Sequence, residues 1–196
     1  RELLKGRSEF KGVSVNHLII KACAYGLSRE RSVNRAIKSG QVFEPRSINI
    51  GIVTAIDDGL LIPVVKEADL LPLHDIVFEA RAAVERARAG RPSATDLTGG
   101  TFSISNMGMF DVDSFTAIIN PGQGAILAVS AVKDTPLVKN GLIVPAKIMK
   151  ATLSVDHRII DGVMASRFLQ HFKQALETPA LLLLADSADS RGSDGN

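Results

Sequence analysis

The sequence contains no tryptophan, one tyrosine and one cysteine among its 196 residues. The lone cysteine, Cys23, cannot form a disulfide within the chain, and it lies in an apolar run that is typical of a buried thiol. This cysteine usage favours a reducing compartment. No apolar stretch reaches the ~20 residues needed to span a bilayer, and the first residues have no signal-peptide core. No membrane partner is therefore expected.

The charges nearly balance, with 23 lysines and arginines against 21 aspartates and glutamates, for a net charge of +2. This balance gives no general electrostatic reason to bind nucleic acid or an acidic membrane surface. Apolar residues make up 45% of the chain, which excludes an intrinsically disordered protein and suffices for one sizeable core or two small ones. The mean hydropathy of +0.16 is high for a small domain and indicates apolar surface that other subunits cover.

Three segments have apolar side chains at intervals of three and four residues, the spacing of one helical face. They are residues 14–29, 72–89 and 161–177. Ser14 and Asp161 stand at the starts of the first and the last segment, where a side-chain oxygen can cap a helix. We therefore expect three amphipathic helices.

Runs of β-branched and large apolar residues predict strands in other parts of the chain. Residues 48–65 predict two consecutive strands joined at an Asp-Asp-Gly turn, and residues 101–105, 124–132 and 147–155 predict one strand each. The order of elements predicts one α/β domain over residues 1–184, with helices flanking a mixed sheet of at least five strands. The small, polar residues 185–196 are expected to form a disordered tail.

Four histidines are candidates for chemistry. His17, His74 and His171 lie within predicted helices, where a lone histidine is usually structural. His157 differs because it follows a predicted strand and precedes a helix, at a position where side chains meet ligands. Imidazole removes a thiol or hydroxyl proton near neutral pH, and the carboxylate of Asp161 can hold the local geometry. A polar turn, in which both residues only cap neighbouring elements, is an equal alternative on this pattern alone.

A second polar pattern is GGTFSISNMG at residues 99–108. Strand alternation puts Ser103 and Ser105 on one side, and the neighbouring glycines allow close approach of the backbone. A solvent-facing strand edge would give the same pattern. A Ser-His-Asp hydrolase is disfavoured because no G-x-S-x-G elbow surrounds either serine. The chain also lacks a phosphate-binding G-x-x-x-x-G-K-[ST] loop and the spacing of a zinc site, so no metal is expected.

Three motifs taken together resemble the catalytic core domain of dihydrolipoamide acyltransferases, the central component of 2-oxo acid dehydrogenase complexes. They are DGLLIPVV at residues 58–65, GGTFSISNMG at residues 99–108 and DHRIIDG at residues 156–162. The resemblance extends from about residue 13 to residue 184. Within the family, FTAIINP at residues 115–121 is similar to the acetyl-transferring members of the pyruvate dehydrogenase type.

The resemblance implies a two-layer, chloramphenicol-acetyltransferase-like fold and a homotrimer with active sites between subunits, assembled into a cubic or icosahedral core. It implies that the enzyme is a dihydrolipoamide acetyltransferase, which moves acetyl between coenzyme A and a lipoamide carried on another domain. His157 is then the general base, Ser105 the donor to the oxyanion and Asp161 an anchor of the active-site loop. The implied partners are the decarboxylase and dihydrolipoamide dehydrogenase components, in the bacterial cytoplasm or the mitochondrial matrix.

The resemblance also implies that the core domains of the family begin with a further segment, which reaches over a neighbouring subunit and carries an arginine that pairs with the residue at the position of Asp161. This chain is expected to lack that segment, so we expect a substitute partner from Arg1, Arg7 or another chain, or else a partly ordered loop. Three alternatives stay open: a branched-chain or other acyl-transferring member of the family, a non-catalytic core scaffold, and a free-standing acyltransferase of the same fold acting on a small alcohol or amine. The contacts of coenzyme A are not assigned.

The acyl pocket is expected to favour a small neutral group. Met109, Phe110 and Phe115 follow the serine strand and would narrow the acyl end, unless they belong to the core or to an interface. No lysine or arginine that could hold a succinyl carboxylate occurs between Gly99 and Val132. Because pocket volume discriminates one methylene by only about 1–3 kcal/mol, the expected preference is graded, with acetyl above branched-chain acyl above succinyl.

Overall fold

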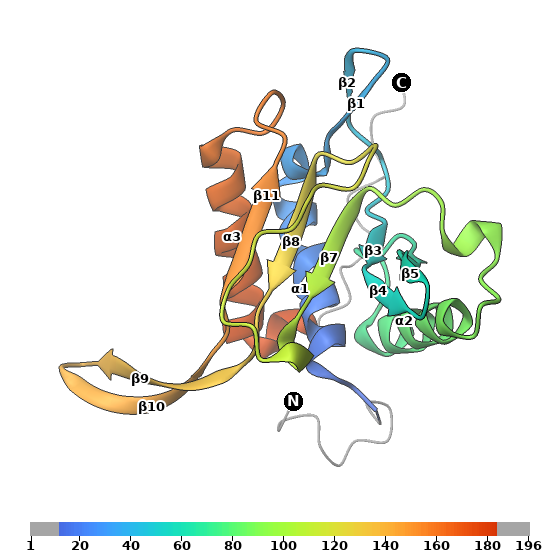
Figure 1. Ribbon diagram of the computed structural model, residues 1–196. Coiled ribbons are helices and arrows are strands. Elements are labelled where there is room, and N and C mark those ends of the chain that lie inside the picture. Colours follow the sequence, from blue (N-terminus) through green and yellow to red (C-terminus); the bar gives the residue numbers. More distant parts are fainter. Residues whose placement is uncertain (1–11, 184–196) are drawn as a thin grey trace.

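The computed structural model describes residues 12–183, and the predicted tail at residues 185–196 lies outside them. The α-helices are α1 (Val15–Arg29), α2 (Leu73–Arg88) and α3 (Gly162–Glu177). The strands are β1 (Ala36–Lys38), β2 (Gln41–Phe43), β3 (Ile50–Ile52), β4 (Thr54–Ile56), β5 (Gly59–Leu61), β6 (Val64–Val65), β7 (Phe102–Asn106), β8 (Ala125–Val129), β9 (Lys133–Lys139), β10 (Leu142–Ile148) and β11 (Ala151–Val155). Short 3₁₀ turns are η3 (Arg31–Asn34), η4 (Ala94–Asp96), η5 (Gly108–Phe110) and η6 (Pro179–Leu182). Figure 1 shows this arrangement.

The three predicted helices are confirmed, each to within one residue at either end. Ser14 caps α1 by accepting a hydrogen bond from the backbone N–H of His17, and Asp161 caps α3. These caps explain why the helices begin where they do, since side-chain oxygens satisfy N–H groups that have no partner within the helix. In residues 12–183, no helix combines the length and the apolar character needed to cross a membrane.

The central sheet has five strands in the order β11-β8-β7-β3-β6. β3, β7 and β8 run parallel, while β6 and β11 pair antiparallel at the two edges. The predicted mixed sheet is therefore confirmed.

Residues 48–65 differ from the prediction, because they form four short strands rather than two. β3 and β6 belong to the central sheet, whereas β4 and β5 form a separate hairpin. The break on the return path falls at Pro63, which has no N–H to continue a ladder and instead accepts a hydrogen bond from Ile52.

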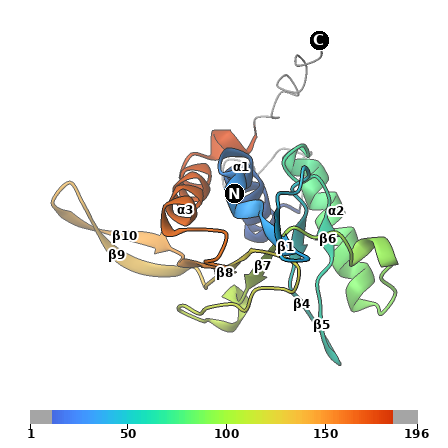
Figure 2. The ribbon, with the colours of Figure 1, turned by 90° about the horizontal axis from the view of Figure 1, so that it is seen from above.

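One face of the sheet carries the hydrophobic core under α1 and α3, as Figure 2 shows from above. Phe102 of β7 meets Phe168 of α3 with ring centroids 5.5 Å apart. The two helices lie close because Gly26 presents no side chain: a Cβ there would lie 3.0 Å from the Phe168 ring. Cys23 of α1 is fully buried in this core, which confirms its predicted burial.

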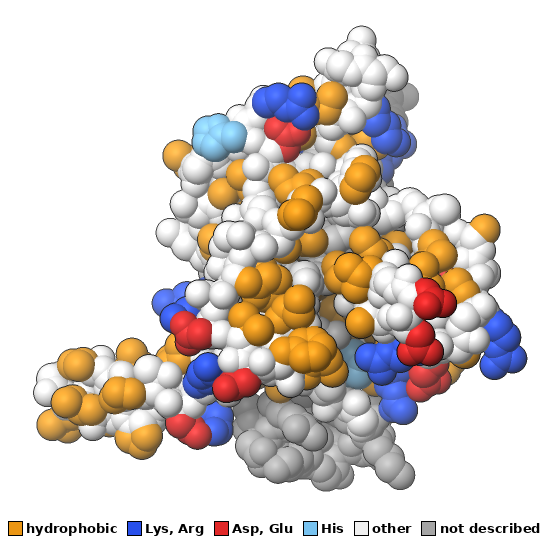
Figure 3. Space-filling model, in the orientation of Figure 1, with side chains coloured by type: hydrophobic (Ala, Val, Ile, Leu, Met, Phe, Trp, Pro, Cys, Tyr) orange, Lys and Arg blue, Asp and Glu red, His pale blue; other side chains and the backbone are white. Residues whose placement is uncertain are grey.

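The opposite face of the sheet is covered in part by the irregular segment 107–124, which crosses it in Figure 1. Side chains of this segment lie in the open: Met109 is 76% exposed, Phe110 63% and Ile118 93%. Figure 3 shows hydrophobic side chains gathered over this face. Apolar surface on this scale is typical of protein contact, as the high mean hydropathy indicates.

A long hairpin, β9–β10, projects from the body in Figures 1 and 2 and was not predicted. The expectation of one strand over residues 147–155 is wrong in its first part, because Ile148 ends β10 and only β11 joins the central sheet. The hairpin turns at Asn140 and Gly141, both with positive φ, which is the requirement of a two-residue type I′ turn. Pro136 faces Pro145 across the ribbon.

Candidate active site

Ser105 lies on the sheet face away from the helices. Strand alternation sends Phe102 and Ile104 into the core and turns Ser103 and Ser105 to the opposite side. The Ser103 hydroxyl is fully buried and donates to Oε1 of Gln123 at 2.7 Å. Ser105 is 8% exposed, and within residues 12–183 its hydroxyl makes no hydrogen bond. The second hydroxyl is thus the one available to a ligand.

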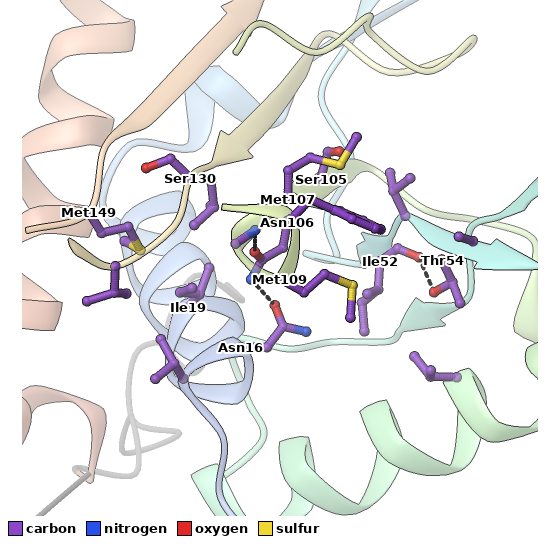
Figure 4. A pocket seen from close by; sticks show the side chains of 18 of the residues that line it. Asn16, Ile19, Ile52, Thr54, Ser105, Asn106, Met107, Met109, Ser130 and Met149 are labelled. Atoms are coloured by element: carbon purple, nitrogen blue, oxygen red, sulfur yellow. Dashed lines mark hydrogen bonds between the residues drawn. The ribbon is translucent and has the colours of Figure 1, made fainter. Parts of the chain in front are cut away.

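A cavity of about 700 Å³ opens beside Ser105 (Figure 4). Its lining side chains come from α1, from α2, from the ends of several strands and from the 3₁₀ turn η5 that follows β7. Its walls are mainly apolar, with Ile19, Ile52 and Met109 among them, and a few polar groups such as Asn16 and Asn106. A mostly apolar concavity with a few placed polar groups is typical of a small-molecule site.

Asn106 fixes the backbone immediately after Ser105. Its Oδ1 accepts the backbone N–H of Gly108 at 2.8 Å, and its Nδ2 donates to Oδ1 of Asn16 at 3.1 Å. The backbone N–H of Met107 donates to the carbonyl of Val129 at 3.0 Å. The end of β7 is therefore held from α1, from β8 and from its own turn.

His157 lies in an exposed turn between β11 and α3. Asp156 and Arg158 on either side of it are joined by two side-chain hydrogen bonds, at 2.9 and 2.6 Å. The Arg158 guanidinium, helped by the Arg158 backbone N–H, lowers the pKa of Asp156 to about 2. The turn is anchored from within by Ile160, which is fully buried. This closed turn presents the imidazole of His157 outward.

Asp161 forms the cap of α3, with its Oδ1 accepting the backbone N–H groups of Val163 and Met164 at 2.8 and 2.9 Å. The Met164 N–H first, and then that of Val163, lowers the pKa of this carboxyl; the charges of His157 and Arg167 add to the effect. The expected arginine partners Arg1 and Arg7 lie outside the described residues.

Gly124 lies directly beneath the His157 turn. Its carbonyl accepts the backbone N–H of Asp156 at 2.8 Å, and a Cβ at this position would lie 2.1 Å from the carbonyl oxygen of Arg35 and 3.2 Å from Cδ1 of Ile160. No side chain fits there without moving backbone. Because Gly124 has no side chain, the backbone before β8 can pack against Arg35 and accept the hydrogen bond from the His157 turn.

Gly124→Ala is accordingly expected to lower the free energy of unfolding by about 1–3 kcal/mol, the usual cost of overpacking, as measured by urea unfolding. The matched control is Gly162→Ala, where an added Cβ meets nothing within 4 Å. Because alanine is favoured over glycine in a helix, the control is expected to be neutral or slightly stabilising. Equal midpoints for the two variants would contradict the close contact at Gly124.

Ser105 and His157 of one chain lie far apart. Ser105 pairs with Ala128 of β8, whereas Val155, the last residue of β11, pairs with Ala125, three residues earlier on β8. Three strand residues span roughly 10 Å and two strand spacings add roughly 10 Å across the sheet, and His157 lies beyond Val155. The two side chains of one chain therefore do not reach one reacting atom.

The other three histidines have local structural contacts. Nδ1 of His17 accepts the backbone N–H of Ser14 at 3.1 Å, and burial first, then the charge of Arg81, lowers the pKa of this ring. His74 lies 3.3 Å from the carboxylate of Asp75, and His171 meets the ring of Tyr25 edge-on at 6.5 Å. Within residues 12–183, no cluster of three or more His, Cys, Asp or Glu side chains could hold a metal ion.

Several residues of the cavity were not predicted from the sequence. Arg88 of α2 lines it and supplies a cation from outside the segment Gly99–Val132, which has no lysine or arginine. Asn16 also lines it, and a lone asparagine in a helical first turn gives no sequence signal of a site. Of the three predicted acyl-end side chains, Met109 and Phe110 line the cavity, whereas Phe115 is not among its lining residues.

Comparison with known proteins now identifies the relatives. Residues 1–184 match the family model of 2-oxoacid dehydrogenases acyltransferase (catalytic domain). The dihydrolipoyllysine-residue acetyltransferase component of the pyruvate dehydrogenase complex of Rickettsia bellii is 37% identical over 172 residues, covering 88% of this chain and 41% of the relative. The mitochondrial component of Schizosaccharomyces pombe is 42% identical over 176 residues, covering 88% and 36%. The chain thus spans less than half the length of these curated relatives.

Solved structures agree with these matches. The cubic core of the pyruvate dehydrogenase multienzyme complex superposes with a TM-score of 0.86 at 32% identity, covering 93% of this chain and 77% of the other. Dihydrolipoamide acetyltransferase of Azotobacter vinelandii gives the same figures. Chloramphenicol acetyltransferase, at 16% identity, 91% and 81% coverage and a TM-score of 0.55, shares the fold. The predicted fold class is confirmed.

The Azotobacter vinelandii structure comes from work on the roles of one serine, one histidine and one asparagine in its catalytic mechanism. In that protein the histidine follows the serine by 52 residues, and the asparagine follows the histidine by 4. In this chain His157 follows Ser105 by 52 residues, and Asp161 follows His157 by 4. The chain belongs to the 2-oxoacid dehydrogenase acyltransferase family, and its residues 1–184 match the catalytic domain of that family.

Proposed function

We propose that this chain is the catalytic domain of a dihydrolipoyllysine-residue acetyltransferase, which transfers acetyl between coenzyme A and a lipoyl group carried on another domain. His157 removes the proton of the incoming thiol as its sulfur attacks the thioester carbonyl. Ser105 donates a hydrogen bond to the oxyanion of the tetrahedral intermediate. When the intermediate collapses, the departing sulfur takes the proton back from His157. One substrate is a thiol and the other is a thioester, and the proposed transfer between them requires no metal.

The observation that carries this proposal is the state of the two serines on β7. The Ser103 hydroxyl donates to Gln123, whereas the Ser105 hydroxyl has no hydrogen-bond partner in the described residues and lines the cavity. Ser105 also precedes His157 by 52 residues, the same spacing as between the serine and the histidine studied in Azotobacter vinelandii. A hydroxyl that is nearly buried and without a partner is poised to stabilise charge that develops in a ligand.

The separation of Ser105 from His157 supports an active site shared between subunits, as we propose for a homotrimer. The exposed apolar segment 107–124 lies on the Ser105 face and supplies surface for such a contact. One structural relative is a cubic core of the pyruvate dehydrogenase complex. We propose that trimers of this chain likewise assemble into a larger cubic or icosahedral core, which meets decarboxylase and dihydrolipoamide dehydrogenase components in bacterial cytoplasm or mitochondrial matrix.

Asp161 is proposed to organise the active-site loop. Its hydrogen bonds to Val163 and Met164 fix the start of α3, four residues after the base. An arginine from a neighbouring subunit could meet the same carboxylate, because Asp161 is exposed at the end of the turn. In this role the carboxylate need not touch either substrate.

The proposed function is tested by a spectrophotometric assay of acetyl, isobutyryl and succinyl transfer from coenzyme A thioesters to dihydrolipoamide. We expect acetyl transfer to be fastest, because the cavity wall formed by Met109 and Phe110 is apolar and favours a small neutral acyl group. Arg88 also lines the cavity, and its positive charge can attract the succinyl carboxylate. The difference in rate between acetyl and succinyl transfer is therefore expected to be smaller than the apolar walls alone would give. An absence of transfer with all three thioesters would favour a non-catalytic scaffold, and isobutyryl as the best substrate would favour a branched-chain enzyme.

A further inference from the structure

Asn16 occupies a position in the cavity that the mechanism above leaves without a role. It lies in the first turn of α1, and its side chain lines the same cavity as Ser105. Figure 4 shows Asn16 pointing toward Asn106, with one amide atom in the hydrogen bond and the other turned away from it. Nearby walls, formed by Val15, Ile19 and Ile52, offer no hydrogen-bonding side chain.

The orientation of the Asn16 amide follows from its partners. The backbone N–H of Gly108 can only donate, so the Asn106 atom that faces it must be Oδ1. Nδ2 of Asn106 therefore faces Asn16, and the Asn16 atom that receives it must be Oδ1. Nδ2 of Asn16, which carries two N–H groups, is left for the cavity. Within residues 12–183 this nitrogen makes no hydrogen bond.

We propose that Asn16 is a substrate-binding residue, whose Nδ2 donates a hydrogen bond to an amide carbonyl in the arm of one thiol substrate. This inference rests on the proposed function. The pantetheine arm of coenzyme A and the lipoyl arm both carry an amide carbonyl on a flexible chain that ends in sulfur. In a mainly apolar cavity, a hydrogen bond from Asn16 to this carbonyl would fix the position of the arm along the cavity without contacting the sulfur.

The rival role for Asn16 is purely structural, because its Oδ1 also holds Asn106. Asn16→Asp separates the two roles. An ionised aspartate keeps the acceptor for Asn106 Nδ2 and has nearly the same shape, but it has no N–H to donate. Its negative charge lies in the first turn of α1, where it favours the helix. Asn16→Ala removes both functions, and Ser28→Ala, at the other end of α1, is the matched control outside the cavity.

The experiment measures kcat and KM of the full-length protein with two neutral substrates, acetyl-pantetheine and dihydrolipoamide, so that the charge of the aspartate does not bias the result. We expect both Asn16 variants to raise the KM for one substrate by about 3- to 10-fold, the value of one neutral hydrogen bond, with little change in kcat. Ser28→Ala is expected to leave both KM values unchanged. The substrate whose KM rises identifies the bound arm.

Two results would overturn the inference: unchanged KM values for both substrates in Asn16→Ala, or wild-type KM values restored in Asn16→Asp. The assignment is checked from the substrate side with an analogue whose amide carbonyl is replaced by a methylene group. With that analogue, wild-type and Asn16→Asp proteins should have equal KM values. Circular dichroism melting establishes that each variant is folded. A wild-type protein that transfers no acetyl group would instead contradict the proposed function.

Discussion

Replacing His157 by alanine is expected to lower kcat for acetyl transfer by about 10²- to 10⁴-fold, the range for removal of a general base. The attacking thiol must lose its proton as the carbon–sulfur bond forms, and the variant lacks the imidazole that is proposed to accept it. The measurement is steady-state transfer from acetyl-CoA to dihydrolipoamide.

The matched control for this substitution is His74→Ala. His74 is an exposed histidine whose described contact is with the neighbouring Asp75, so its removal should leave kcat within about 2-fold, as for most surface substitutions. Stability should be little changed in both variants, because His157 is exposed in a turn that the Asp156–Arg158 pair closes without it. A His157→Ala protein with near wild-type kcat would show that another group accepts the thiol proton.

Ser105→Ala is expected to lower kcat by about 10²- to 10³-fold, the value of one oxyanion donor, while KM changes little. The hydroxyl is proposed to meet charge that exists only in the intermediate, so ground-state binding does not depend on it. Ser103→Ala is the matched control on the same strand. It should lower stability by about 1–3 kcal/mol, because Gln123 loses its buried partner, and it should leave kcat nearly unchanged. A Ser105→Ala protein in which only KM rises would make Ser105 a binding residue.

The same two variants test where the site lies. If each site takes Ser105 from one subunit and His157 from the next, random mixing of the two variants in trimers restores about one quarter of the sites. Co-expressed His157→Ala and Ser105→Ala chains should therefore recover far more activity than either variant alone. If the mixture is as inactive as its components, the site is built within one chain, against the geometry of the sheet.

The fold was predictable where the apolar pattern of a segment matches the faces that the segment buries. α1, α2 and α3 have one apolar face each and clear starts, so their limits follow from spacing and capping. β7 and β8 are almost entirely buried, and their apolar runs predict strands.

The β9–β10 hairpin could have been found from its Asn-Gly pair, which is a strong turn signal. Pro136 and Pro145 lie within the flanking runs and weaken this signal, because proline within a run argues against a strand. In an isolated ribbon this argument fails, since every residue is at an edge and a missing N–H can face solvent.

The candidate site was predictable only in part, for a different reason. His157 and Ser105 belong to local motifs that the resemblance places in the site. Asn16 and Arg88 reach the cavity from helices that are distant in sequence, and nothing in their own segments distinguishes them from surface residues. Such residues are brought to a site by helix packing, which local pattern does not encode.

The burial of Cys23 protects its thiol from side reactions with the substrates of the proposed reaction. Acetyl thioesters pass their acyl group to any accessible thiolate, and oxidised lipoyl groups exchange with thiolates to form mixed disulfides. Burial raises the pKa of the Cys23 thiol well above its ordinary value and keeps it from solvent. The single sulfhydryl of the chain is thus unreactive toward both substrates of the proposed reaction, so the protein itself would not take up the acetyl group or the lipoyl disulfide.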